Sequence, residues 1–375
     1  MVYLQLFNLL LMKLILDYFK SHKVEAIILI MALILLIWVG ITLTINTGWS
    51  FIFDSNSIDH FGSFMGGLAT FIGIYYLYMT LRSQNESFQI QNFESKFIEL
   101  IKFNRDLVSS MKATYTYSID MQQISGKEIF DFFNQQMENA IEIVSTFINS
   151  RELSSLYNNS EQYNTDKDLW NETQLKKRTI MNISYLITFF GVKANGCSLL
   201  KNKYLTQYKA EEIEELLKLF RMKLAMNENS TDSAETNPLN ISRILTSENK
   251  LFAGFQNELG NYFRTFFQCV NFANKQKFIK YSDKYDYVKM LRGQLSNMEE
   301  VVLFYNSLSD IGIAWEYYYY KNQDFNNMLI TKYNLIKNIP ENFTKFSASL
   351  FYPMVFFEHM TTEPANRAII ERKYT

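Results

Sequence analysis

The sequence AIILIMALILLIWVGITLTINTGWSFIF, residues 26–53, contains no charged side chain. About 20 apolar residues are enough to cross a bilayer as a helix, so this stretch predicts a first transmembrane span at about 26–48. Trp49 and Phe51 follow it, where aromatic side chains collect at a membrane interface. A second uncharged stretch predicts a second span at 61–81. The two spans predict a transmembrane helical hairpin, with the lipid bilayer as its partner.

Basic residues on either side of the hairpin predict its orientation. Lys13, Lys20 and Lys23 precede the first span and Arg82 follows the second, whereas the connection at 54–60 contains no Lys or Arg. Loops that carry Lys and Arg stay on the cytoplasmic side of a membrane. We therefore expect both termini to lie in the cytoplasm.

Small residues recur every three or four positions in the second span, at Gly62, Gly66, Ala69 and Gly73. Small side chains at this spacing let helix backbones approach each other closely in lipid. This face could form a homo-oligomer with other copies of the chain, or it could pack against the first span of the same chain. The sequence favours both interpretations equally.

Three parts follow from these patterns. Residues 1–23 are predicted to form an amphipathic segment at the membrane interface, residues 24–82 the hairpin, and residues 83–375 a cytosolic domain. The whole chain contains only 13 Gly and 4 Pro, the residues that interrupt helices most strongly. The predicted fold class is therefore mainly α, with an all-α cytosolic domain after the transmembrane hairpin.

Apolar periodicity places helices and loops within the cytosolic domain. Phe93, Phe97 and Met111 belong to a series with spacings of three and four, which predicts that the second span continues as a cytosolic helix. Two polar stretches, 150–168 and 227–249, predict exposed loops.

Composition excludes several kinds of site. Lys and Arg number 37 and Asp and Glu 38, so the overall charge does not favour nucleic acid as a partner, although it leaves a local site open. Two cysteines cannot form a disulfide framework or a four-ligand zinc site. Only His359 of the three histidines lies outside the membrane-proximal part. We therefore predict no metal site and no cofactor.

Four segments resemble a known family. They read FESKFIELIKFNRDLV at Phe93–Val108, ELGNYFRTFFQCVNFANK at Glu258–Lys275, YVKMLRGQLSNMEEVVLFYNSLS at Tyr287–Ser309 and ITKYNLIKNIP at Ile330–Pro340. Together they are similar to the bacterial phage abortive infection family, to which lactococcal AbiC is related. The resemblance implies phage defence at the bacterial cytoplasmic membrane, triggered by a phage or host factor. It implies no known reaction. Phe103 stands where the family usually has histidine, so no role of that histidine can be transferred.

A polar stripe is the main candidate for a functional site. Arg292, Ser296, Glu299 and Asn306 share one face of a predicted helix, and Gln294 lies beside them. With Arg264 from an earlier helix, they could form a ligand pocket or effector site. They could also form a structural ion-pair network that joins this helix to those of Arg264 and Glu94. We favour the network, because ion-pair networks with a purely structural role produce the same pattern of residues.

A basic patch at Lys277, Lys280 and Lys284 is interleaved with aromatic residues, a combination that can bind single-stranded nucleic acid. A solvated helix face explains it better, because acidic residues interrupt the run. The glycines of Gly191–Ser198 have P-loop spacing but lack the required lysine, so a turn between helices is expected.

The sequence contains no recognisable catalytic motif, which leaves open whether the protein is an enzyme. The preferred hypothesis is a membrane-anchored protein that defends bacteria against phage by abortive infection. Its cytosolic domain would sense infection, and its hairpin would anchor that domain or transmit the response. The alternatives are a membrane-tethered nuclease or nucleotide-processing effector, and a non-catalytic membrane scaffold.

Overall fold

The structure is a computed structural model that describes residues 55–117, 120–229, 252–317, 324–364 and 367. These residues are mainly helical, which confirms the predicted class. They divide into two compact units, residues 1–89 and residues 90–375. The first predicted span, at 26–48, lies outside the described residues. Within the described ranges, no helix combines the length and the hydropathy that crossing a membrane requires.

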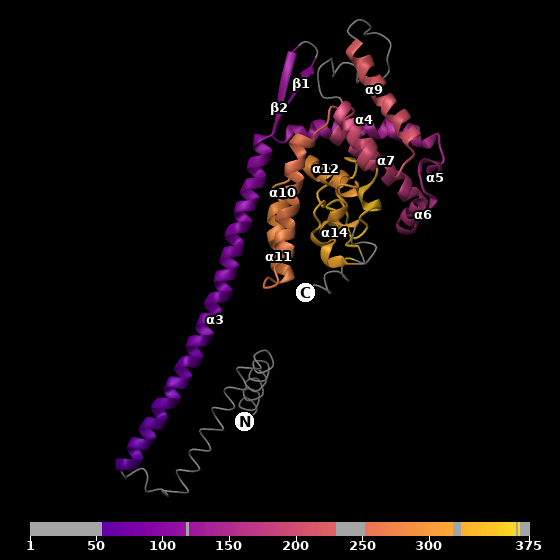
Figure 1. Cartoon of the computed structure of the whole chain (residues 1–375). Helices are drawn as coiled ribbons and strands as arrows, with labels where there is room; N and C mark the ends of the chain where they lie inside the picture. The colour runs from indigo at the N-terminus through magenta and orange to yellow at the C-terminus, as the bar shows by residue number, and fades with distance from the viewer. Residues whose placement is uncertain (1–54, 118–119, 230–251, 318–323, 365–366, 368–375) are drawn as a thin grey trace. The chain divides into compact units, whose positions relative to one another are not determined.

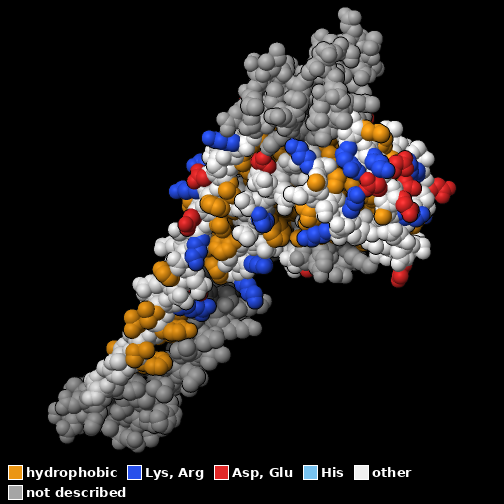
Figure 2. All heavy atoms as spheres, turned by 45° about the horizontal axis from the view of Figure 1, so that its top comes forward, with side chains coloured by type: hydrophobic (Ala, Val, Ile, Leu, Met, Phe, Trp, Pro, Cys, Tyr) orange, Lys and Arg blue, Asp and Glu red, His pale blue; other side chains and the backbone are white. Residues whose placement is uncertain are grey.

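The described part of the first unit belongs to a long helix, α3 (Ser55–Ser110), which continues into the second unit. It begins inside the predicted connection at 54–60 and contains the second predicted span, 61–81. Its surface between residues 71 and 81 carries large apolar side chains, visible as part of the orange surface in Figure 2. These exposed side chains are Phe71, Ile72, Ile74, Tyr76, Leu77, Tyr78 and Leu81.

The small residues of the second predicted span lie on the surface of α3. Ala69 is exposed, and a methyl group added at Gly62, Gly66 or Gly73 would meet no atom within 4 Å among the described residues. The described structure therefore shows no helix packed against this face. The interpretations in which it contacts another copy or the first span stay predictions.

Three helices form the centre of the second unit, α4 (Glu128–Asn149), α7 (Glu172–Phe190) and α12 (Asn297–Leu308). They pack against one another, as Figure 1 shows. Every residue from Arg178 to Phe190 and from Glu299 to Leu308 is buried. A helix buried on all sides has no amphipathic stripe to reveal it, so length and flanking capping residues identify it instead.

Phe93, Phe97 and Ile101 on the later part of α3 are buried in the same core. This agrees with the predicted helical face, but the helix ends at Ser110. A β-hairpin follows, formed by β1 (Lys112–Tyr117) and β2 (Asp120–Ser125), which pair antiparallel from Lys112 opposite Ser125. The expectation of an all-α domain was therefore wrong at this point. Alternating Thr and Tyr in KATYTY favour a strand.

The polar stretch at 150–168 is also not simply a loop. It contains α5 (Leu153–Leu156) and most of α6 (Ser160–Leu169). Helix α6 has no buried residue, so it lacks the apolar periodicity that would have predicted it. The side chain of Asn159 accepts a hydrogen bond from the Glu161 N–H (2.9 Å) and caps its first turn.

The remaining elements surround the central helices. The predicted turn at Gly191–Ser198 includes the start of α8, and the predicted loop at 227–249 falls mostly outside the described residues. From residue 313 onward the helices are short. These elements are α8 (Ala194–Leu199), the π-helical turn η2 (Leu200–Tyr204), α9 (Ala210–Asn229), α10 (Gln256–Asn274), α11 (Tyr281–Arg292), the 3₁₀ turns η5 (Ile313–Trp315), η6 (Phe325–Asn327) and η7 (Ala348–Leu350), and α14 (Leu329–Tyr333).

Candidate functional site

A pocket of about 530 Å³ lies in the second unit, and it opens to solvent. One face of α10 forms much of its wall, and the end of α7, the end of η2, Asn306 of α12 and the segment around η5 form the rest. This volume falls in the range of small-molecule sites, which combine apolar walls with a few polar groups. Its aromatic lining residues are Phe189, Phe190, Tyr204, Phe263, Phe267 and Trp315.

The polar wall of the pocket comes mainly from α10. Gln256, Gly260, Arg264 and Gln268 recur every four residues, which places them on one side of the helix. Among the described residues that line the pocket, Arg264 is the single charged one. The remaining lining groups on this side are amides and aromatic rings, so Arg264 determines the charge of the pocket.

Arg264 is exposed, and its hydrogen bonds stay within its own helix. Its Nε donates to the Gly260 carbonyl oxygen (3.1 Å), and its Nη2 donates to Asn261 Oδ1 (2.6 Å). No carboxylate among the described residues forms an ion pair with it. The guanidinium is therefore held over the α10 face while its positive charge stays available to a bound anion.

Asn306 connects the pocket wall to the core. Its buried side chain accepts a hydrogen bond from Trp315 Nε1 (3.0 Å) through Oδ1 and donates one from Nδ2 to Tyr185 Oη (2.8 Å). Gly312 packs so closely that a methyl group there would overlap the backbone oxygen of Asn306. Because both ends of the amide are used, Asn306 fixes the orientation of the Trp315 indole in the pocket.

Two other members of the predicted polar stripe form the start of α12. Ser296 Oγ accepts from the Glu299 N–H (3.2 Å), and Glu299 accepts from the Ser296 N–H (2.7 Å), which is a capping box. The buried Glu299 carboxylate also pairs with Lys127 Nζ at 3.1 Å. Gln294 is exposed, and its backbone oxygen accepts from the same lysine (2.8 Å). These contacts join the beginnings of α4 and α12.

Arg292 has a different role. It is buried, and its Nη1 donates to the carbonyl oxygens of Tyr333 (3.0 Å) and Asn334 (2.9 Å). Arg367 binds the preceding carbonyls of Thr331 and Lys332. The last carbonyls of a helix have no partner inside the helix, and an arginine can supply one. The two guanidinium groups thus cap the C-terminal end of α14.

The structure therefore separates the residues of the polar stripe. Arg264 and Asn306 line the pocket, Ser296 and Glu299 cap α12, and Arg292 caps α14. The ion pairs expected to reach Arg264 and Glu94 are not among the contacts of the described residues. Glu94 instead accepts a hydrogen bond from Tyr287 Oη at 2.5 Å. The pocket aromatics were missed because they come from elements far apart in the sequence.

Residues 254–344 match the model of a family described as "Putative phage abortive infection protein". The chain is similar to phage abortive infection proteins over this segment. No curated protein and no solved structure matches the chain. The abortive infection segment, residues 254–344, contains all of α10, α12 and η5, and with them Arg264, Asn306 and Trp315.

The predicted basic patch also lies within the abortive infection segment. Lys277 and Lys280 are exposed, whereas Lys284 is half-buried and its Nζ donates to the Asn274 carbonyl oxygen (3.1 Å). Burial lowers the pKa of Lys284. Lys284 therefore joins the beginning of α11 to the end of α10, so the three lysines do not form one uniform exposed surface.

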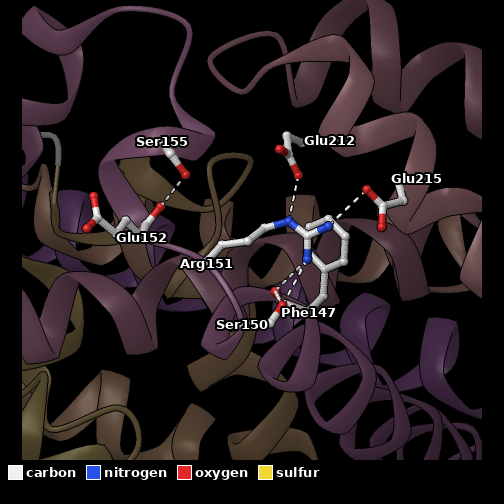
Figure 3. A network of polar contacts seen from close by, with 7 residues as sticks. All are labelled: Phe147, Ser150, Arg151, Glu152, Ser155, Glu212 and Glu215. Atoms are coloured by element: carbon white, nitrogen blue, oxygen red, sulfur yellow. Dashed lines mark hydrogen bonds and ion pairs between the residues drawn. The ribbon is translucent and has the colours of Figure 1, made fainter.

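A polar network outside the abortive infection segment was not predicted. Figure 3 shows Arg151, just beyond α4, reaching two carboxylates of α9. Its Nε donates to Glu212 (2.8 Å) and its Nη2 to Glu215 (2.9 Å), while the guanidinium lies 3.7 Å from the centre of the Phe147 ring. A further bond to the Phe147 carbonyl (3.1 Å) places the same group at the end of α4. The network uses all of these groups to hold α4 against α9.

The described residues contain neither a cluster that could hold a metal ion nor an exposed cysteine. Across the described ranges, no three His, Cys, Asp or Glu side chains are arranged to hold a metal ion. Cys197 and Cys269 are buried as free thiols. Burial raises the pKa of both, to about 12 for Cys269, which disfavours the reactive thiolate.

Proposed function

We propose that this chain is a membrane-anchored phage abortive infection protein whose helical unit, residues 90–375, senses infection through the pocket on α10. The observation that carries the proposal is the family match at 254–344. That segment supplies Arg264, the aromatic residues of α10, and Trp315 with its supporting Asn306. The segment similar to the defence family is thus the one that builds most of the pocket.

The membrane anchor in this proposal is the hairpin at 24–82. The uncharged stretch at 26–53 supports it, as do the exposed apolar side chains of α3 between residues 71 and 81. The balance of Lys and Arg around the hairpin supports cytoplasmic termini. We propose the bacterial cytoplasmic membrane as its location. The small residues from Gly62 to Gly73 would bring hairpins together in a homo-oligomer.

A phage or host factor produced during infection would act as the trigger at the pocket. The hairpin would then transmit the response to the membrane. In this proposal the pocket on α10, with the charge of Arg264, senses the trigger. The hairpin, with its apolar surface, produces the response. The structural roles of Arg292 and Glu299 leave Arg264 as the residue of the polar stripe whose replacement tests function without disturbing the fold.

The test is a phage challenge of bacteria that express the full-length chain. We expect fewer plaques, together with arrest or death of the infected cells before phage release. Arg264→Ala removes the charge of the pocket and should abolish protection at equal protein level. Arg105→Ala is the matched control, because Arg105 is exposed on α3 and has no ion-pair partner in the described ranges.

Normal plaque numbers at confirmed expression, across a broad phage panel, would refute the defence function. Protection that survives Arg264→Ala would refute sensing at this pocket. Membrane potential and RNA integrity, recorded in the same infected cells, separate the two kinds of response. Loss of potential with intact RNA supports a response through the hairpin, whereas degraded RNA with normal potential contradicts it and supports the nuclease alternative.

A further inference from the structure

We infer that the pocket on α10 binds a nucleoside monophosphate, with the base among the aromatic side chains and the phosphate at Arg264. The inference deepens the sensing role proposed above by naming the class of ligand. It can be tested on the purified protein without phage. Three groups of residues carry it: the aromatic walls, the amides of α10 and the guanidinium.

Four of the six aromatic side chains that line the pocket form two contacting pairs. Phe190 and Tyr204 lie parallel, with ring centres 4.3 Å apart and an angle of 20° between the ring planes. Phe267 and Trp315 meet edge to face at 4.9 Å and 82°. Flat heteroaromatic rings stack on such side chains with useful affinity. Trp315 is 2% exposed and its indole N–H already binds Asn306, so this ring forms a fixed apolar part of the pocket wall.

The amides of α10 are suited to the polar edge of a base. Gln256, Asn257 and Gln268 are exposed and line the pocket, and their side chains form no hydrogen bond with any residue in the described ranges. Each carboxamide has both a donor and an acceptor, which matches the mixed donors and acceptors on the edges of nucleobases. These side chains would form hydrogen bonds with the polar edge of a base, which a purely apolar ring could not do.

The charge of the pocket fits one phosphate group. Arg264 is its single charged lining residue in the described structure, and two of the guanidinium nitrogens already bind α10. These bonds hold the side chain in place, while Nη1 forms no hydrogen bond to a described residue. Arginine binds phosphate through strong charge-assisted hydrogen bonds. One guanidinium would neutralise a monophosphate better than a chain of several phosphates, and a long nucleic acid would require a row of cations.

The size of the pocket agrees with this assignment. Its volume of about 530 Å³ is suited to a small molecule, and its opening to solvent lets a soluble nucleotide enter. The base and the phosphate would contact groups on the same face of α10. A ligand with a ring alone or an anion alone would use only part of this face.

The experiment measures binding to the full-length protein, purified in a mild detergent, by calorimetry and by a change in tryptophan fluorescence. The probes are the four ribonucleoside 5′-monophosphates, the four nucleosides without phosphate, and inorganic phosphate. We expect at least one monophosphate to saturate the protein, and its nucleoside to bind at least about tenfold more weakly, as loss of a charge-assisted hydrogen bond predicts. Inorganic phosphate alone should bind more weakly still.

Two variants separate the contributions of base and phosphate. Arg264→Gln should lower the affinity for the monophosphate to that of the nucleoside, whereas the matched Arg105→Gln should retain the difference. Phe267→Leu removes a partly buried ring of the pocket and should weaken monophosphate and nucleoside equally. Unchanged circular dichroism establishes that each variant is folded.

The inference is overturned if no monophosphate binds, if nucleoside or inorganic phosphate binds equally well, or if Arg264→Gln leaves the preference unchanged. Its failure is distinguishable from failure of the proposed function. A protein that protects cells but binds no monophosphate contradicts only the choice of ligand. A protein that binds the nucleotide at Arg264 but gives no protection contradicts the defence function and supports the ligand.

Discussion

At the scale of single residues, two arginines of similar appearance in the sequence have opposite roles. Arg292 is buried and donates to two backbone carbonyls, whereas Arg264 is exposed and keeps its charge available. A buried guanidinium without partners would be costly, so the contacts of Arg292 are a requirement of the fold. A loss of protection in an Arg292 variant would therefore report unfolding, and only Arg264 is suited to a functional test.

Glu316 provides a prediction about pH. Its buried carboxylate accepts hydrogen bonds from the Thr331 N–H (2.8 Å) and from Thr331 Oγ1. Burial raises the pKa of Glu316 from 4.5 to about 7, although these bonds and the nearby charge of Arg367 act in the opposite direction. The folded protein therefore binds this proton more tightly than the unfolded chain does. The stability that it contributes is complete below about pH 4.5 and is lost as the pH rises through about 7.

In Glu316→Gln, a neutral amide keeps both contacts, since its oxygen can accept from the N–H and its nitrogen can donate to the hydroxyl. Between low and neutral pH, the free energy of unfolding of this variant should fall by about 3 kcal/mol less than that of the wild type. Each pKa unit corresponds to about 1.4 kcal/mol. Urea unfolding over a pH series measures this difference. The exposed Glu142 on α4 gives a control variant, Glu142→Gln, with the pH profile of the wild type. Identical profiles for Glu316→Gln and wild type would contradict the assignment.

The predicted site was found only in part, and the reason is physical. Helical spacing identified Asn306, and Arg264 was added to the candidate site from an earlier helix; both line the pocket. It did not show that Ser296 and Glu299 satisfy the backbone of their own helix, although an S-x-x-E pattern is a capping signal. Helical spacing also did not assign Trp315 to a site. Its place in the pocket depends on contacts between distant segments, which periodicity along one helix does not describe.

At the scale of elements, three glycines allow the close backbone packing at the C-terminal end of α7. Gly191 ends α7 with a φ of 77°, a left-handed conformation that favours glycine. A methyl group at Gly191 would overlap the backbone of Ala253, and one at Gly254 would lie 2.7 Å from the Phe190 carbonyl oxygen. A methyl group at Gly196 would overlap Gly191 itself. The glycines that resemble a P-loop thus allow backbone to pack on backbone beside the pocket.

We expect Gly191→Ala to destabilise the protein by about 3 kcal/mol or more, because the change combines a left-handed backbone with steric overlap. Gly293→Ala is the matched control at the end of another helix. Its φ is −60°, and its added methyl group would lie 3.4 Å from the Lys289 carbonyl oxygen, an ordinary contact. That variant should unfold at or slightly above the wild-type temperature. Equal melting temperatures for the two variants would show that the close packing at Gly191 is not needed.

Apolar periodicity predicted the helices that have one buried face, including the later part of α3. Apolar periodicity failed for two elements, for different reasons. Helix α6 has no fully buried residue and therefore carries no clear apolar stripe. The β-hairpin at 112–125 follows a helix directly, and Met111 was counted with the helical series although the helix ends at Ser110. The short helix α14 is capped by Arg292 and Arg367, which come from distant parts of the sequence.

At the scale of the whole molecule, the proposed hairpin predicts which residues lie outside the cell. Ser57→Cys in the predicted connection should react with a membrane-impermeant maleimide in intact spheroplasts. Ser87→Cys, beyond the second span, should react only after the membrane is permeabilised. The native Cys197 and Cys269 are buried, so background labelling should be low. Labelling of both positions in intact spheroplasts, or of neither before permeabilisation, would contradict the hairpin and its orientation.

Extraction of the membrane fraction is a second test of the hairpin. A chain that carries the hairpin should stay in the membrane pellet through high salt and alkaline carbonate. Release by carbonate would indicate that residues 24–82 lie on the membrane surface. Nucleotide binding at Arg264 should be unaffected in either case, because the pocket is built entirely from residues of the second unit.

The capping of α14 by two arginines has a consequence for synthesis on the ribosome. Arg292 precedes the helix, but Arg367 lies 35 residues after Lys332, whose carbonyl it binds. Domains begin to fold from the N-terminal side while translation continues. Helix α14 can therefore be half-capped as it emerges, but its second cap becomes available only after those further residues have been added. Helix α14 therefore receives its second cap late, after the pocket residues of α10 and η5 have been synthesised.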